Sequence, residues 1–354
     1  MNSFIKFLML EGGNAEIEGH SSDSINLITH NRDHITKDIF ASLKDISSEF
    51  KNFFGVPLWS KDLLDSRKFM SGSTIHFFNK DIPSKEFVGK KNRVGDIDVM
   101  VDENFKAHLI DFLNKSKNKT MGEMTLLAHK ASAGTQISIW HLPKYNINVQ
   151  VDFELVDYDN SEPTEWSKFS RSSDWGDMSS GIKGAMHKLL MRALMSKDRV
   201  DMVIRMKTKD KEETSTEYAL SPSGLRQRYL HTGETKNGKG VYTETKGEFN
   251  KNLSEIIKHV FGVEPKEEDI RKFWNFGGMI ELIKKHFNPE DQNKTVNGFL
   301  RLLFGSDAQG LYRGDPHRDM EEKMTAVDYM DSKGLKIDRE LLSSLQKEFY
   351  SKYK

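Results

Sequence analysis

Apolar side chains recur at helical spacing in two stretches of the first half of the chain. Between residues 35 and 54 they fall three or four positions apart, which places them on one face of a helix, and Gly55 is a natural end for it. These apolar positions are Ile35, Ile39, Phe40, Leu43, Ile46, Phe50 and Phe53. The same spacing predicts a helix over residues 103–119, with an apolar face of Phe105, Leu109, Phe112 and Leu113.

Two other segments alternate apolar and polar residues with the period of a strand. In residues 95–101, GDIDVMV, the aliphatic side chains fall on one face, while Asp96 and Asp98 fall on the other. Residues 147–156, INVQVDFELV, alternate in the same way and place Asp152 on the polar face of a second strand. Residues 136–142 precede a turn signal, PKYN, so we expect them to pair with 147–156 as a hairpin.

The pattern changes after residue 157. Residues 158–180 are loop-like, with Trp166 and Trp175 as anchors, and 181–197 predict a helix. Residues 200–247 are rich in strand signals, and helical spacing dominates from residue 248 onward. We therefore expect an α+β protein in four parts. These are an N-terminal extension (1–32), a core of a mixed sheet with helices packed on it (33–160), a helix plus β-rich region that completes a cleft (161–247), and a helical C-terminal domain (248–354).

Composition narrows the classes of function. The chain has 354 residues, 53 Lys and Arg against 53 Asp and Glu, and no cysteine. The balanced charge gives no overall basic excess for nucleic acid, although a local basic face remains open. Without cysteine there is no disulfide, thiolate zinc site or thiol nucleophile. No run approaches the ~18 apolar residues of a membrane span, so we expect no membrane partner and a cytoplasmic location.

The two aspartates of GDIDV predict a cation site. Carboxylates two residues apart on one strand face repel each other, and a divalent cation between them relieves the repulsion. Hard oxygen ligands of this kind suit Mg²⁺ or Mn²⁺. Upstream, Gly72 and Ser73 form a small turn whose hydroxyl and main-chain N–H groups can hold a phosphate.

Together, the Gly72-Ser73 turn, the Asp96-x-Asp98 pair preceded by Gly95 and the lone Asp152 on a later strand resemble the nucleotidyltransferase superfamily with the DNA polymerase β-like fold. The glycine before the Asp pair is similar to family X polymerases. The segments LEGGN, GST and GDIDVMVD also resemble nucleotidyltransferase-like proteins encoded by phages. The resemblance covers about residues 33–157. One departure concerns the 22 residues between Ser73 and Asp96, more than is usual in the superfamily.

The resemblance implies a function and a set of roles. The function is metal-dependent transfer of a nucleoside monophosphate from an NTP or dNTP to a hydroxyl acceptor such as DNA or tRNA, with release of pyrophosphate. Asp96, Asp98 and Asp152 would be the catalytic residues and the ligands of Mg²⁺ or Mn²⁺. Nucleotide-binding residues would be Gly72, Ser73, Thr74, Lys183 and Lys188. A phage origin would place the enzyme in the cytoplasm of a host cell.

Several alternatives stay open at the level of sequence. The two lysines can simply form the solvated face of an amphipathic helix. The long basic segment 74–94 favours a degenerate domain that binds nucleotide or a partner without turnover, whereas the three retained carboxylates favour an enzyme. The neutral net charge also allows a transferase that modifies a protein or a small molecule.

Overall fold

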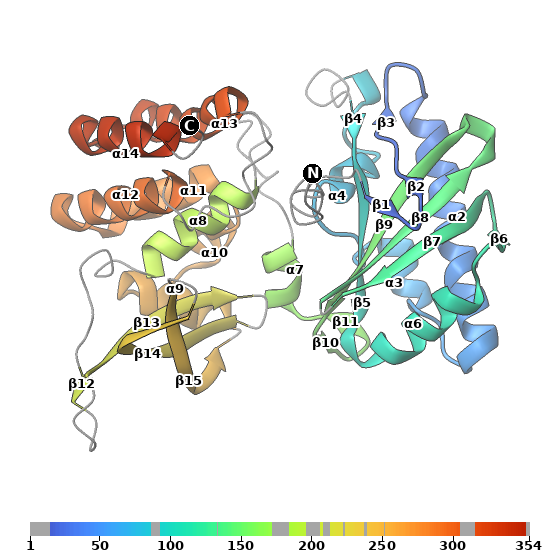
Figure 1. The fold of residues 1–354 in the computed structure, drawn as a ribbon, viewed down its shortest axis with the longest axis horizontal. Coiled ribbons are helices and arrows are strands. Elements are labelled where there is room, and N and C mark those ends of the chain that lie inside the picture. The colour runs from blue at the N-terminus through green and yellow to red at the C-terminus, as the bar shows by residue number, and fades with distance from the viewer. Residues whose placement is uncertain are drawn as a thin grey trace. The chain divides into compact units, whose positions relative to one another are not determined.

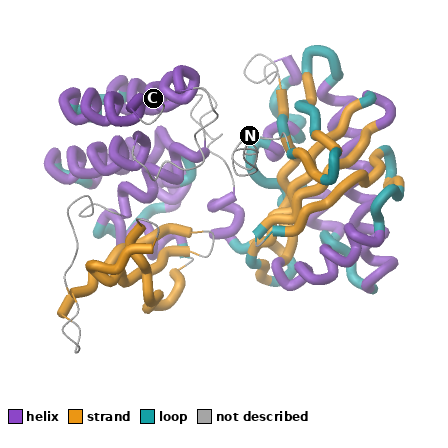
Figure 2. Tube along the Cα trace, in the orientation of Figure 1, coloured by secondary structure: helices purple, strands orange, loops and turns teal. Residues whose placement is uncertain are grey.

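The computed structural model describes residues 15–85, 93–132, 134–171, 184–195, 206–207, 213–221, 224–236, 239–250, 252–304 and 316–351. The chain forms two compact units, residues 1–172 and 173–354. Figure 1 shows strands and helices in both units, and Figure 2 distinguishes helices, strands and loops by colour. The protein therefore belongs to the α+β class.

The first unit is built on a five-stranded mixed sheet in the order β5-β9-β8-β7-β6. Its strands are β5 (Asp96–Asp102), β6 (Thr120–Met121), β7 (Met124–Ala131), β8 (Thr135–Leu142) and β9 (Ile147–Val156). Strand β5 runs parallel to β9, and every other neighbouring pair is antiparallel. The hairpin of β8 and β9 turns through η2 (Pro143–Tyr145), as the sequence predicts.

Helices α2 (Arg32–Phe54), α3 (Lys61–Ser66) and α6 (Lys106–Lys115) pack behind this sheet (Figure 1). The rings of Phe50 on α2 and Phe112 on α6 lie 5.5 Å apart. Helix α2 begins three residues before the predicted start because the Asn31 side chain accepts hydrogen bonds from the N–H groups of residues 33 and 34. It ends at Gly55, whose φ of 79° is a left-handed cap.

The predicted apolar strand faces are confirmed. Ile97, Val99 and Val101 are fully buried on β5, as are Val151 and Phe153 on β9.

The helix predicted over 103–119 is shorter than expected: η1 (Glu103–Phe105) leads into α6, which ends at Lys115. The shorter helix leaves room for β6 and β7, two strands that the sequence pattern did not indicate.

The other face of the sheet is covered in part by the N-terminal residues. Here β1 (Glu16–Ile17) pairs with β2 (His20–Ser21), and Ala15 and Ile17 pack on Ala128 and Ile139 of the sheet. Strand β3 (Ile25–Asn26) pairs with β4 (Arg93–Val94), directly before β5. These residues thus belong to the packed body of the first unit.

Three short elements close the first unit. They are β10 (Tyr158–Asp159), β11 (Glu162–Pro163) and α7 (Glu165–Arg171). Trp166 is 1% exposed, so it anchors this stretch as predicted. Trp175 lies outside the described residues.

The second unit combines a four-stranded antiparallel meander with helices. The strands are β12 (Met206–Lys207), β13 (Glu213–Ser221), β14 (Gly224–Lys236) and β15 (Lys239–Asn250). The helices are α8 (Gly184–Met195), α9 (Leu253–Phe261), α10 (Glu267–Phe273), α11 (Phe276–His286), α12 (Pro289–Phe304), α13 (Pro316–Ser332) and α14 (Arg339–Ser351). The β-rich and helical regions expected from sequence are both present, whereas the four-part division into domains stays a prediction.

None of the helices that the structure describes is long and apolar enough to span a membrane.

Candidate metal centre

Three carboxylates converge at the pairing of β5 and β9. Asp98 stands directly opposite Asp152 in the parallel register, and Asp96 precedes Asp98 on the same strand face. One oxygen from each of Asp96, Asp98 and Asp152 lies within 4.8 Å of the others, and all three side chains are partly buried. The parallel register therefore brings together carboxylates from two separate segments of the chain.

The turn at Gly72 lies against Asp98. A Cβ atom at position 72 would stand 2.5 Å from Oδ2 of Asp98, closer than real contacts allow, and Gly72 has a φ of +55°. Both facts favour glycine at this position, because a Cβ would displace the Asp98 carboxylate and other side chains rarely adopt this φ. The preceding residues pair with β5: the N–H of Ser71 donates to the carbonyl of Asp98 at 3.1 Å, and the N–H of Met100 donates to the carbonyl of Phe69 at 2.6 Å. The turn is thereby fixed beside the acidic cluster.

The two residues after Gly72 have different surroundings. Ser73 is partly exposed and precedes the short helix α4 (Thr74–Phe77) without capping it through its side chain. Thr74 is fully buried, and its hydroxyl oxygen accepts a hydrogen bond from the N–H of Asp98 at 2.8 Å. Thr74 therefore has a clear part in holding the turn on β5, and Ser73 is the residue of the two that reaches the surface.

Two further polar residues share the face of Asp152 on β9. Gln150, two residues before it, donates from Nε2 to both oxygens of Asp152 at 2.9 and 3.0 Å. Glu154, two residues after it, accepts at Oε2 a hydrogen bond of 2.5 Å from the Ser71 hydroxyl. The alternation of the sequence places both on the polar strand face but assigns neither a role, although the two-residue spacing from Asp152 was the available signal.

The electrostatics of Asp152 differ from those of an ordinary aspartate. Burial raises the pKa of the Asp152 carboxyl to about 7, and the nearby charge of Asp96 acts in the same direction. The hydrogen bonds from Gln150 lower this pKa, while Glu154 adds a smaller raising effect. A carboxyl destabilised in its charged form by burial and like charge is one that a cation would stabilise.

The predicted lysines of the second unit cannot be placed at this site. Lys183 lies outside the described residues, and Lys188 is on helix α8, where its side chain is not described. Lys90 and Lys91 of the long segment 74–94 also lie outside the described residues, whereas Arg93 is an exposed residue of β4.

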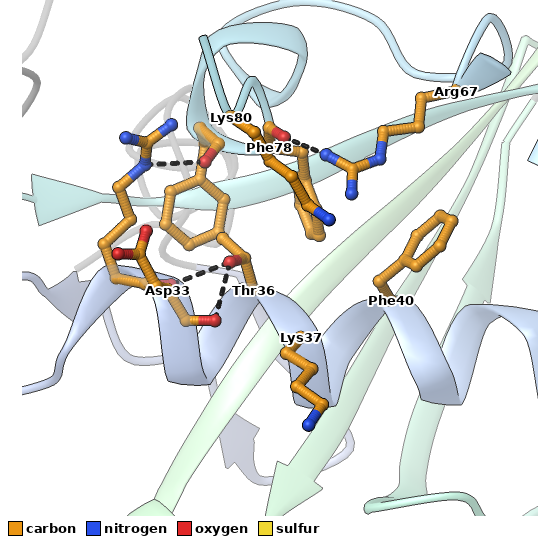
Figure 3. Close-up of a pocket in the computed structure, with 9 residues that line it drawn as sticks. Asp33, Thr36, Lys37, Phe40, Arg67, Phe78 and Lys80 are labelled. Atoms are coloured by element: carbon orange, nitrogen blue, oxygen red, sulfur yellow. Dashed lines mark hydrogen bonds between the residues drawn. The ribbon is translucent and has the colours of Figure 1, made fainter. Parts of the chain in front are cut away.

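A hollow of about 240 Å³ lies between α2 and the stretch after α4 (Figure 3). Arg67 donates to the carbonyl of Phe78 and stands over the ring of Phe40, 4.9 Å from its centroid. The buried guanidinium of Arg32 donates to four main-chain carbonyls of this stretch, those of His76, Phe77, Asn79 and Ile82. The two arginines therefore hold in place the chain that follows the Gly72 turn.

The donor set of the acidic cluster fits a hard divalent cation. Carboxylate oxygens are the ligands that Mg²⁺ and Mn²⁺ prefer, and the missing side chain of Gly72 leaves space at Asp98 Oδ2. Among the described residues, no other group of three or more acidic or histidine side chains has the spacing to hold a metal ion.

Comparisons with protein-family models, with curated proteins and with solved structures found no match to this chain.

Proposed function

We propose that this chain is a metal-dependent nucleotidyltransferase with a polymerase β-like core, which transfers a nucleoside monophosphate from an NTP or dNTP to a hydroxyl acceptor. The observation that carries the proposal is the convergence of Asp96, Asp98 and Asp152 on two parallel neighbouring strands. The glycine turn packed against Asp98 adds to it, because the sequence resemblance pairs such a turn with such carboxylates.

The reaction assigns a task to each of these residues. The acceptor oxygen forms a bond to the α-phosphorus, the bond from that phosphorus to the bridging oxygen breaks, and pyrophosphate leaves. Bound Mg²⁺ or Mn²⁺ would supply charge stabilisation at the attacking and leaving oxygens. Asp96, Asp98 and Asp152 would hold these cations. Asp152 would also accept, at a carboxylate oxygen, the proton of the attacking hydroxyl.

The turn residues act on the nucleotide. The main chain at Gly72 and the partly exposed Ser73 would contact the phosphates, close to Asp98. Position and charge then do most of the catalytic work, so a cysteine nucleophile is not required, in line with a chain that has none.

A panel of α-labelled NTPs and dNTPs with Mg²⁺ or Mn²⁺ tests the proposal directly. Single-stranded DNA, gapped duplex, tRNA and total protein serve as acceptors, and pyrophosphate release is measured alongside label transfer. Transfer should need the cation and should vanish in Asp98→Asn, while Asp111→Asn, on the exposed side of α6, should behave as wild type. Transfer that persists in EDTA or in Asp98→Asn would contradict the proposal. Cation-dependent nucleotide binding without turnover would instead indicate a binding module.

A further inference from the structure

The side chain of Gln150 connects the acidic cluster to the N-terminal part of the chain. Its amide nitrogen donates to both oxygens of Asp152. Its amide oxygen accepts from the main-chain N–H of Ala15 at 3.0 Å and from the hydroxyl of Ser22 at 3.5 Å. Gln150 is 2% exposed, so bulk water does not compete for these contacts.

The contact with Ala15 determines the orientation of the Gln150 amide, that is, which of its oxygen and nitrogen atoms faces Ala15. A main-chain N–H can only donate a hydrogen bond, so the atom of Gln150 that faces it must be the oxygen. The amino group is thereby turned toward Asp152. If the amide were flipped, its NH₂ group would face the N–H of Ala15, which is also a donor. Its oxygen would then face the carboxylate of Asp152, which is also an acceptor. The orientation is thus determined from outside the acidic cluster.

The N-terminal residues that hold Gln150 are themselves seated on β9. Asn148, two residues before Gln150, donates from Nδ2 to the carbonyl of Ser21 at 3.1 Å. The N–H of Asp23 donates to the carbonyl of Asn148 at 2.7 Å, and Asp23 Oδ2 accepts from the N–H of Asn148 at 2.9 Å. Ala15 also packs in a small apolar cluster on the sheet. These contacts give the acceptor side of Gln150 a fixed partner.

We propose that Gln150 is a positioning residue for Asp152 and that residues 15–22 keep its amide in the working orientation; this rests on the proposed metal site. Both oxygens of Asp152 are bonded to one nitrogen, which restricts rotation of the carboxylate, and one of its oxygens lies within 4.8 Å of oxygens of Asp96 and Asp98. Each oxygen still has a lone pair for a cation, since a carboxylate accepts about four contacts. Outer partners of this kind orient ligating carboxylates, and their removal costs roughly 10–100-fold in metal affinity.

Calorimetric titration of Mn²⁺ into the full chain tests the inference, with three proteins compared. Gln150→Met nearly keeps the length and volume of the side chain but removes the amide, so it has no donor for Asp152 and only a weak sulfur acceptor for Ala15. Asn148→Ala is the matched control, because it removes a contact to the same N-terminal residues and leaves Gln150 intact. Gln150→Met should weaken Mn²⁺ binding by roughly 10–100-fold, and Asn148→Ala should bind as wild type does. The electron paramagnetic resonance spectrum of bound Mn²⁺ should change only in the Gln150 variant.

The outcomes separate this inference from the proposed function. Wild type that binds Mn²⁺ while Gln150→Met binds it equally well overturns the positioning role and leaves the metal site standing. An equal loss in both variants also overturns it, because Asn148→Ala keeps the hydrogen bonds of Gln150 to Ala15 and Asp152, so the loss would not come from those bonds. Wild type that binds no Mn²⁺ overturns the metal site and the inference with it. If Gln150→Met does not reach the wild-type far-ultraviolet circular dichroism spectrum, Gln150→Ala, which admits water at Ala15, replaces it under the same criteria.

Discussion

Asp98 and Asp152 occupy directly paired positions on two parallel strands, so their carboxylates leave the sheet on the same face. In a parallel pair, this arrangement brings together residues from distant parts of the chain without a turn between them. Each carboxylate has a local support: the Gly72 turn lies against Asp98, and Gln150 bonds Asp152. The site is thus supported on both strands.

Replacing Asp98 with alanine should remove transferase activity by at least ~10³-fold, the scale expected when a charge-stabilising metal is lost. Stability should hardly fall, because removing one of three neighbouring carboxylates relieves repulsion. Turnover and a thermal unfolding curve measure the two effects, with Asp111→Ala as a surface control. Turnover within about tenfold of wild type would argue against the proposed metal-dependent mechanism.

Gly72→Ala should weaken metal binding, whereas Gly55→Ala should not. Both glycines have a left-handed φ, so both substitutions carry a similar backbone cost of about 1 kcal/mol. At position 55 a Cβ meets nothing within 4 Å, but at position 72 it meets Oδ2 of Asp98, which must rotate away. Mn²⁺ affinity and urea unfolding should be measured on both variants. Equal Mn²⁺ affinities in the two would show that Gly72 has only a backbone role.

In the metal-free protein, the contribution of Asp152 to the free energy of unfolding should decrease as the pH rises toward neutrality. The folded pKa of this group is raised from 3.8 to about 7, so the folded state keeps a proton that the unfolded state has released. The folded state is therefore favoured at low pH by this group, and the contribution is lost between about pH 4 and pH 7. Asp152→Asn removes this slope.

Urea unfolding in EDTA between pH 4 and pH 8 measures this contribution. The difference between wild type and Asp152→Asn isolates Asp152 from the other titrating groups, and its slope should have the sign given above. A difference that stays constant with pH would contradict the raised pKa.

Arg32→Ala should destabilise the first unit by about 3 kcal/mol. The buried guanidinium donates to four main-chain carbonyls, and its loss leaves them without those donors. Arg339→Ala, which breaks an exposed ion pair with Asp331, should cost less than about 1 kcal/mol. Urea unfolding of the two variants compares them. Similar costs would mean that water readily replaces Arg32.

Alternation in the sequence was enough to place the three aspartates. Because side chains on a strand follow a period of two, the positions of Asp96, Asp98 and Asp152 in the sequence are sufficient to assign their strand faces. The same rule puts Gln150 beside Asp152 but cannot say which atom of the amide faces it, since that depends on Ala15. The strand face of Gln150 was therefore predictable from sequence, whereas its hydrogen bonds to Asp152 and Ala15 were not.

The apolar and polar pattern of the sequence did not indicate two features of the structure, which are strand β7 and the break between α10 and α11. In β7, Leu126 and Leu127 are adjacent apolar residues, and the register with β8 shifts at Leu126 and Ala128. Apolar contacts on both faces of the sheet hide the alternation, because N-terminal residues cover the second face. Residues 266–287 lie in the stretch where helical spacing dominates, but they form two helices, α10 and α11, because Asn275 caps α11 by accepting a hydrogen bond from the N–H of Gly278 at 2.6 Å.

The parallel pairing of β5 with β9 also has a consequence for the order of folding. Strands β7, β8 and β9 pair with chain neighbours through short turns, so the entropy lost in joining them is small. Strand β5 can pair only after β9 has formed, and β9 lies beyond helix α6 and the three strands β6, β7 and β8 in the chain. Long-range parallel contacts form slowly for this reason. We therefore expect the meander of β7, β8 and β9 to form first and the three aspartates to meet only when β5 docks, late in the folding reaction.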